Sequence, residues 1–168
     1  MSRRELVVHP HPVLRRKAAP VARVDDTVRE LVMEMFQIMT EEDGVGLAAP
    51  QVGESLRVFV TGERAHDQVP ARVFINPVLR DLEGELEPHD EGCLSLPGIR
   101  GMIRRPPKVT IEALDLEGKP FTLTSDAFCA RVWQHEFDHL EGVMIVDRMT
   151  ALDRIRIRKV LKDLEADA

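Results

Sequence analysis

The segment QHEFDHLEG, Gln134 to Gly142, contains residues whose types and spacing suit metal chemistry. On a helix, His135 and His139 lie about 40° apart around the axis and roughly 6 Å apart along it, so both imidazoles can reach one ion. Glu136 points to a different side of the same helix, which suits a general base better than a ligand. The H-E-x-x-H pattern predicts a metal-dependent hydrolase, and taken alone it is typical of a zinc protease.

A catalytic site of this kind needs a third protein ligand and one open position. In the longer H-E-x-x-H-x-x-G-x-x-H pattern the third histidine falls at position 145, where the chain has Ile145. A thermolysin-like site would need a downstream glutamate. Glu165 is available, but it lies near the end of the chain in DLEADA, a poor place for a rigid ligand.

The two cysteines differ in their ability to complete the site. On a shared helix Cys129 would lie roughly 9 Å from His135 along the axis and about 120° around it, too far for bonds of ~2.3 and ~2.0 Å to one ion. Cys129 is therefore expected to be a core residue. Cys93 lies in the turn-rich segment DEGCLSLPG and is free to approach from another element, so it is the best candidate for a Cys-His-His site.

The elements that must position these residues follow from hydrophobic periodicity. An apolar stripe predicts a helix, with Thr27 and Glu30 as a capping box and Gly44 as its end. The stripe consists of Val28, Leu31, Val32, Met35, Phe36 and Met39. A second helix is expected over 127–142 and a third over 151–166, with its apolar face formed by Leu152, Ile155, Val160, Leu161 and Leu164. The opening proline-rich segment should be extended and irregular.

Strands are predicted between the first two helices, from β-rich composition and alternation. They cover 56–61, 72–76, 78–87, 108–115 and 121–125, and DLEGK at 115–119 is expected to form a hairpin turn. Residues 60–71 are expected to include a surface loop. The predicted fold class is α+β: antiparallel sheets packed around a central helix that carries the metal motif, with an N-terminal and a C-terminal helix.

Composition limits the class of protein. A chain of 168 residues fits one catalytic domain, 1–168, and 43% hydrophobic residues are ordinary for a globular protein. A net charge of −6 argues against a nucleic-acid footprint over the whole surface, so no DNA partner is expected. The sequence shows neither a membrane span nor a secretory signal, so a cytoplasmic protein is expected; a mature organellar protein is the alternative.

Three segments in order, GVGLAAPQ (44–51), EGCLS (91–95) and QHEFDHLEG, resemble the three motifs of peptide deformylase. The resemblance extends over nearly the whole chain through SLPGIRG and KVTIEALDLEGKPF. Trp133 is bulkier than the aliphatic residue that the family pattern leads us to expect. The resemblance implies removal of the N-formyl group from formyl-methionyl peptides and nascent chains, with release of formate.

The resemblance also assigns roles to residues. Cys93, His135 and His139 would hold the metal, and Glu136 would be the general base. Gln51 and the backbone N–H of Leu94 would bind the oxyanion. Val45 and Gly46 would pair with the substrate backbone, and Gly46 would allow its close approach. Arg100 would contact the peptide.

A thiolate with two imidazoles suits zinc and also ferrous iron. The resemblance favours Fe²⁺ in the cell, with Zn²⁺, Ni²⁺ or Co²⁺ in purified protein. The cations of the last helix, Arg154, Arg156, Arg158, Lys159 and Lys162, are either a solvated face or a dock for ribosomal RNA.

Three other classes are less consistent with the residues. A zinc endopeptidase lacks its third histidine here, and a closed structural zinc site needs neither Glu136 nor Gln51. A base deaminase would require H-x-E and P-C-x-x-C, and neither pattern occurs in the chain.

Overall fold

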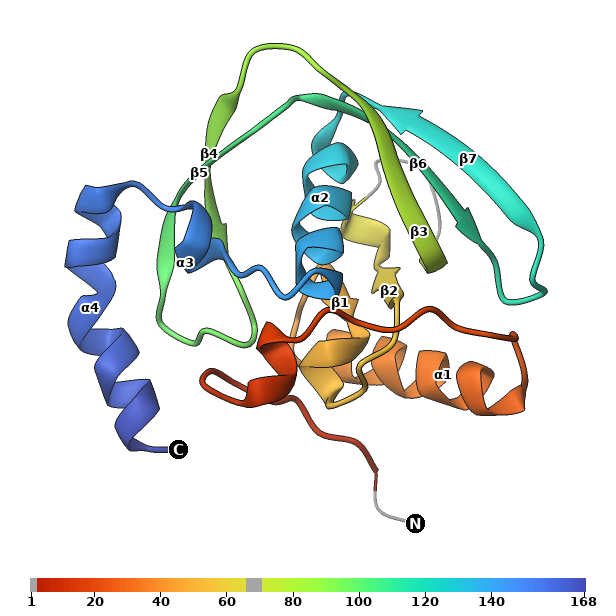
Figure 1. Ribbon diagram of the computed structural model, residues 1–168, viewed down its shortest axis with the longest axis horizontal. Helices are drawn as coiled ribbons and strands as arrows, with labels where there is room; N and C mark the ends of the chain where they lie inside the picture. Colours follow the sequence, from red (N-terminus) through yellow and green to blue (C-terminus); the bar gives the residue numbers. More distant parts are fainter. Residues whose placement is uncertain (1–2, 66–70) are drawn as a thin grey trace.

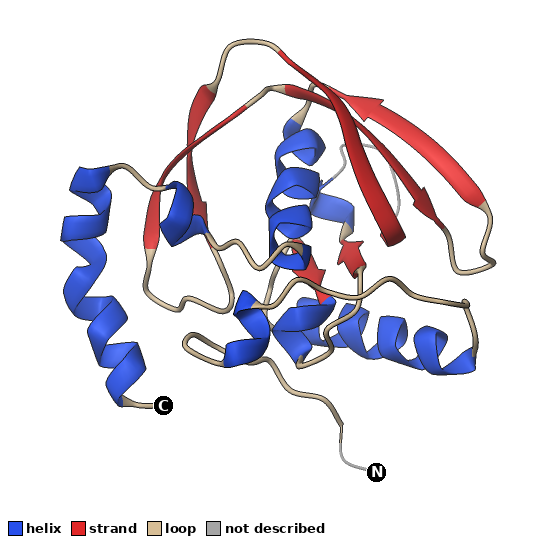
Figure 2. Ribbon diagram, viewed as in Figure 1, coloured by secondary structure: helices blue, strands red, loops and turns tan. Residues whose placement is uncertain are grey.

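A computed structural model describes residues 3–65 and 71–168. Helix α2, Phe128–Leu140, stands at the centre, between a five-stranded sheet and a two-stranded sheet (Figure 1). Figure 2 shows the same arrangement coloured by element type. The other elements are η1 (Pro12–Arg15), α1 (Asp26–Glu41), β1 (Gly46–Ala48), η2 (Ala49–Val52), β2 (Val58–Thr61), η3 (Glu63–Ala65), β3 (Arg72–Glu83), β4 (Glu87–Gly92), β5 (Arg100–Arg105), β6 (Lys108–Leu114), β7 (Pro120–Ser125), α3 (Ile145–Arg148) and α4 (Ala151–Ala166).

The strand pairs within both sheets are antiparallel. The larger sheet has the order β1-β2-β3-β6-β7, which places β1 at its edge, and the smaller sheet is the β4–β5 hairpin. The expected α+β class, with a central helix that carries the H-E-x-x-H motif, is confirmed. The expected hairpin turn between β6 and β7 is also present, since Asp115 Oδ1 accepts from the N–H groups of Glu117 and Lys119.

Strand β3 corrects the prediction of two separate strands at 72–76 and 78–87. It runs without interruption through Pro77, with a shift in its pairing to β6 between Ile75 and Val78. The bulge holds Asn76 at φ 50° and accommodates the proline, which has no N–H to donate to the ladder. The Asn76 side chain fixes the bulge by bonding to both the N–H and the carbonyl of Val21.

Strands β1, β4 and β5 were not predicted. The β4 sequence EPHDEG is charged and mostly exposed, so it lacks the apolar alternation that signals a strand. Strand β5 alternates in burial, but its sequence RGMIRR places Arg105 at a buried position. Strand β1 has three residues, all buried, within the glycine-rich motif.

Helix α1 lies where expected, but its ends differ. The N-cap is Asp25, whose carboxylate accepts from the Val28 N–H, so the helix begins before Thr27 and the predicted capping box is not used. At the other end Asp43, not Gly44, adopts the left-handed backbone conformation, with φ 57°. The Gly44 N–H bonds back to the Met39 carbonyl. This end of the helix leads directly into β1.

Helix α4 has the predicted bounds but a different buried face. Leu152 and Ile155 are 68% and 60% exposed, whereas Ile157 is buried and Leu161 and Leu164 pack against the same core cluster. The buried stripe also includes Asp153, whose carboxylate accepts from the Met102 N–H of β5. Leu161 and Leu164 of the predicted face are therefore confirmed, whereas Leu152, Ile155 and Val160 are exposed, because one narrow stripe at i, i+4 and i+8 docks this helix.

Core packing accommodates the two unusual residues noted in the sequence. Trp133 is buried, with its ring 6.0 Å from that of Phe74 on β3, and Cys129 lies in the same cluster, as predicted. Of the expected surface loop at 60–71, Val60 and Thr61 are instead buried in β2, and residues 66–70 lie outside the described residues. The opening segment is irregular apart from η1. Among the described residues, no helix is long and apolar enough to cross a membrane.

Candidate metal centre

Two elements bring the three predicted ligands together. Cys93 follows β4 in a turn, and His135 and His139 project from one side of α2. Their ligand atoms all lie within 4.8 Å of one another, and Cys93 Sγ is 3.4 Å from His139 Nε2. Tetrahedral bonds of ~2.3 Å to sulfur and ~2.0 Å to nitrogen would separate two such ligand atoms by ~3.5 Å. The donor set and spacing therefore fit one small divalent ion.

Glu91 orients one of the histidines. Its Oε1 lies 2.9 Å from His135 Nδ1, and because a carboxylate only accepts, Nδ1 must carry the proton and Nε2 is left for the metal. Burial by itself would raise the pKa of Glu91, but hydrogen bonds from His135 and Arg105 outweigh it and hold the pKa well below its usual range. Glu91 is therefore ionised when it binds His135.

A buried ion cluster surrounds Glu91. Arg105 donates to both of its oxygens, at 2.8 and 3.0 Å, and Arg131 donates to Oε2 at 2.7 Å. Arg105 also donates to Asp138, which accepts two further bonds from Arg148. These residues were missed in the sequence because an isolated arginine or aspartate gives no signal. The glutamate two positions before the cysteine in EGCLS was the one available hint.

Glu136 is 4% exposed, and its Oε1 has no hydrogen-bond partner among the described residues. Burial raises the pKa of Glu136 to about 7, against the opposing effect of the positive charge on His135. Gly46 on β1 makes room for this carboxylate, because a Cβ there would lie 2.8 Å from Glu136 Oε2. The sequence had suggested that Gly46 allows close approach of a substrate; here it allows close approach of Glu136.

Gln51 lies in η2, buried, with its amide aimed at the metal ligands. Its Oε1 accepts from the Ala48 N–H, which leaves Nε2 directed towards Ser95 Oγ at 3.2 Å and Cys93 Sγ at 3.6 Å. Ser95 in turn donates to the Val7 carbonyl. The Leu94 N–H donates to no other described residue. Two hydrogen-bond donors thus flank the cysteine.

A cavity of about 650 Å³ opens onto these groups. Val45, Gly46, Leu94 and Arg100 all line it, as do Gln51 and Glu136. The Val45 carbonyl accepts from the Gly62 N–H. Because successive residues of a strand present their backbone groups to opposite edges, Gly46 faces the free edge of β1. The Arg100 side chain is exposed and paired with Asp90 at 2.6 Å.

The arrangement defines a class: a hydrolase site with a Cys-His-His cluster that fits one metal ion, a buried carboxylate beside it and an edge strand along the cleft. The comparisons with known proteins give the family. The polypeptide deformylase family model matches residues 3–155. Peptide deformylase of Azotobacter vinelandii is 46% identical over 153 residues, 91% of this chain and 90% of the relative. That of Maricaulis maris is 41% identical, over 100% of this chain and 99% of the relative.

Comparison with solved structures gives the same family. Peptide deformylase from Legionella pneumophila superposes with a TM-score of 0.89 at 38% identity, covering 98% of this chain and 96% of that one. The Synechococcus elongatus enzyme in complex with actinonin gives a TM-score of 0.86 at 39% identity, over 95% and 85% of the two chains. The chain belongs to the peptide deformylase family. It is a metal-dependent hydrolase that removes the N-formyl group from the N-terminal formyl-methionine of newly made polypeptides and releases formate.

Proposed function

We propose that Cys93, His135 and His139 hold the catalytic divalent ion and that the whole chain, 1–168, is one catalytic domain. The observation that carries the metal assignment is the clustering of three ligand atoms within 4.8 Å, with the spacing expected for a tetrahedral site. A divalent ion held there supplies Lewis-acid chemistry, since it acidifies water and polarises a carbonyl oxygen. The other steps depend on side chains and backbone groups of the chain.

Glu136 takes the proton of the attacking water and passes it to the leaving amine nitrogen. The role is supported by its burial, by the absence of a described partner for Oε1, and by a pKa of about 7, near the optimum for proton exchange at neutral pH. The Gln51 amide and the Leu94 N–H stabilise the oxyanion that forms on the formyl group. Both are donors fixed before the reaction, which is the condition for this form of stabilisation.

The substrate peptide adds as a strand along the free edge of β1. The backbone of Gly46 provides the groups for pairing, with Val45 at the start of the edge. Arg100 lies at the rim of the cavity, where its guanidinium meets the carbonyl groups or terminus of a longer peptide.

We propose Fe²⁺ as the ion in the cell, with Zn²⁺, Ni²⁺ or Co²⁺ able to occupy the same site in purified protein. A thiolate with two imidazoles accommodates each of these metals. Protein purified without oxygen should contain about one iron per chain and lose formate release in air as iron and Cys93 oxidise. The test is metal analysis paired with formate release from formyl-Met-Ala-Ser before and after exposure to air. An air-stable zinc enzyme of full activity would overturn the assignment to iron.

We propose that the enzyme works in the cytoplasm and docks on the ribosome through α4. Support for the dock comes from Arg158, Lys159 and Lys162, which are exposed and form no ion pair with any described residue. Arg154 is instead bonded to the carbonyls of Val146 and Asp147, and Arg156 is paired with Asp153.

Charge reversal tests this dock without removing the packing of α4. A triple variant with Arg158, Lys159 and Lys162 changed to Glu should lose salt-sensitive pelleting with ribosomes while keeping formate release from a short peptide. The control changes three exposed cations of the N-terminal segment, Arg16, Lys17 and Arg23, to Glu. Equal pelleting of the two triple variants would reject the dock.

A further inference from the structure

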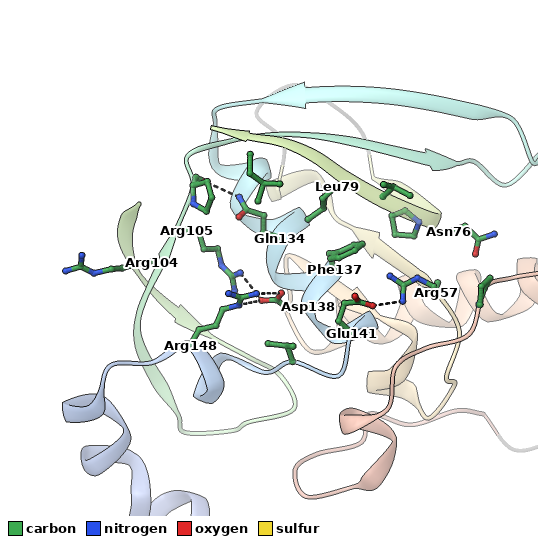
Figure 3. Close-up of a pocket in the computed structure, with 16 residues that line it drawn as sticks. Arg57, Asn76, Leu79, Arg104, Arg105, Gln134, Phe137, Asp138, Glu141 and Arg148 are labelled. Atoms are coloured by element: carbon green, nitrogen blue, oxygen red, sulfur yellow. Dashed lines mark hydrogen bonds and ion pairs between the residues drawn. The ribbon is translucent and has the colours of Figure 1, made fainter. Parts of the chain in front are cut away.

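A second cavity, of about 920 Å³, lies on a different face of α2 from the metal centre (Figure 3). Gln134 and Phe137 of α2 and its C-cap Glu141 line it, at the i, i+3 and i+7 spacing of one helical face. Strand β3, the end of β5 and α3 contribute to its other walls. We call this cavity the rear pocket. None of the three metal ligands lines it.

One end of the rear pocket is cationic. Figure 3 shows Arg105 and Arg148 converging on Asp138, with Arg148 bonded to both carboxylate oxygens at 2.6 and 2.8 Å. Within the buried cluster, the guanidinium groups of Arg105, Arg131 and Arg148 share the two carboxylates of Glu91 and Asp138. Three guanidinium groups against two carboxylates leave the cluster with surplus positive charge, even before His135, which also bonds to Glu91, is counted.

Arg148 is the accessible member of that cluster. Its side chain is 43% exposed, against 3% for Arg105 and 12% for Arg131. Its Nε and Nη2 are bound to Asp138, and its Nη1 donates to no described residue. An anion entering the rear pocket would meet this nitrogen first.

The middle of the rear pocket is apolar. Leu79 and Phe137 lie between the two charged ends in Figure 3, and Val78 and Leu82 line the cavity while remaining 53% and 49% exposed. At the other end Arg57 pairs with Glu141 at 2.8 Å and lies 5.4 Å from the Phe137 ring, so its charge is matched. The surplus positive charge thus lies at the Arg148 end, beside apolar surface that is exposed to water. Arg104 adds to it, because it also lines the cavity, is exposed and forms no ion pair with a described residue.

We propose that the rear pocket binds a small amphipathic carboxylate, with its head group on Arg148 and its apolar body along Leu79, Leu82 and Phe137. A guanidinium matches a carboxylate in shape, and the surplus positive charge at this end favours an anionic head group. Burial of the ligand's apolar body covers Val78 and Leu82, which is favourable because it removes exposed apolar surface from water. The site is separate from the deformylation chemistry and does not rest on it.

Decanoate is a suitable probe, used as monomer and followed by methyl NMR of the metal-loaded enzyme. It should shift the methyl signals of Val78, Leu79 and Leu82 with saturation at about 1 mM or below, the range of a weak small-molecule site. Decanol should bind about tenfold more weakly and decyltrimethylammonium more weakly still, because neither carries the negative charge. Methyl shifts confined to Leu94 and Leu96, which line the cavity at the candidate metal centre, would overturn the proposal. Equal binding of the three compounds would also overturn it.

Two pairs of matched variants test separately the binding of the ligand's carboxylate and of its apolar body. Arg148→Gln should weaken decanoate about tenfold, since it removes a charge-assisted hydrogen bond, while Arg156→Gln, an aspartate-paired arginine on α4, should not. Leu82→Ser should weaken decanoate several-fold, and Leu86→Ser, equally exposed but outside the rear pocket, should leave it unchanged. Both leucines are at the surface, so this second pair remains decisive if Arg148→Gln does not fold. Equal affinities within both pairs would contradict the proposal.

Discussion

Glu91 connects the candidate metal site to the buried arginine cluster, because it accepts hydrogen bonds from His135, Arg105 and Arg131. Glu91→Gln keeps the shape but removes the charge that compensates two buried guanidinium groups. We expect metal affinity to fall at least ~10-fold, as for other groups that orient a metal-bound histidine, and the free energy of unfolding to fall by ~3 kcal/mol. Competition with a chromogenic chelator and urea unfolding measure the two effects.

The control for this prediction is Glu87→Gln. Glu87 lies on the same hairpin, but it is exposed and its carboxylate makes no bond to any described residue. Equal metal affinity in the two variants would mean that Glu91 does not orient His135.

Gln51 provides the second prediction for a single residue. Removing one fixed donor to an oxyanion typically costs ~3 kcal/mol, so Gln51→Ala should lower kcat for formyl-Met-Ala-Ser roughly a hundredfold. Because Gln51 also bonds to Ala48 and Ser95, a thermal melt must show that the variant is folded. A folded Gln51→Ala enzyme with the kcat of the wild type would remove Gln51 from the reaction.

At the scale of elements, β1 approaches α2 most closely where Gly46 meets the side chain of Glu136. Gly46→Ala would place a Cβ 2.8 Å from Glu136 Oε2, and the carboxylate would have to move. We expect kcat to fall ~100-fold with the metal retained, since displacement of a catalytic group by about 1 Å has an effect of that size. Gly62→Ala is the control, because the nearest neighbour of its Cβ would be the flexible end of Met39 at 3.2 Å, and the Val45 carbonyl at 3.8 Å is at ordinary contact distance. A fully active Gly46→Ala enzyme would contradict the close contact.

The elements also show which parts of the fold could be predicted from the sequence. The amphipathic stripe of α1 and the H-E-x-x-H spacing on α2 are local patterns, so both helices were found. Strand β4 was missed because its EPHDEG sequence is mostly exposed. Pairing with β5, rather than burial of apolar side chains, stabilises this strand. The buried face of α4 was only partly predicted: Leu161 and Leu164 were included and Ile157 was not. Several leucines and isoleucines compete along that helix, and only tertiary contacts decide between them.

The residues of the candidate site were likewise only partly predictable from the sequence. Elimination by spacing selected Cys93, and the family motifs indicated Gln51 and Glu136. The partners of these residues could not be found, because Arg105 and Asp138 act only through a buried cluster that spans β4, β5, α2 and α3. Gly46 was recognised as a point of close approach, but the neighbour that requires it is Glu136, which lies 90 residues away in the chain.

For the whole molecule, the proposed ion would link the β4–β5 side, through Cys93, to the central helix α2, through its two histidines. An ion bound a hundredfold above its Kd stabilises the folded state by about 2.7 kcal/mol. Removal by a chelator should therefore lower Tm by ~5–10 °C in a chain of this size. Calorimetry with and without chelator measures the change, and His135→Ala should show almost none. Equal chelator effects in the two proteins would indicate an ion bound elsewhere.

The most direct test of the proposed site is the Glu136→Ala variant, with metal content and formate release measured on the same anaerobic preparation. Glu136 lies in sequence between the two proposed ligands, His135 and His139, and we assign it proton transfer and no metal bond. The prediction is one ion per chain, as in the wild type, and no measurable formate from formyl-Met-Ala-Ser. Loss of the metal would show Glu136 to be a ligand, and retained turnover would show that another group is the base.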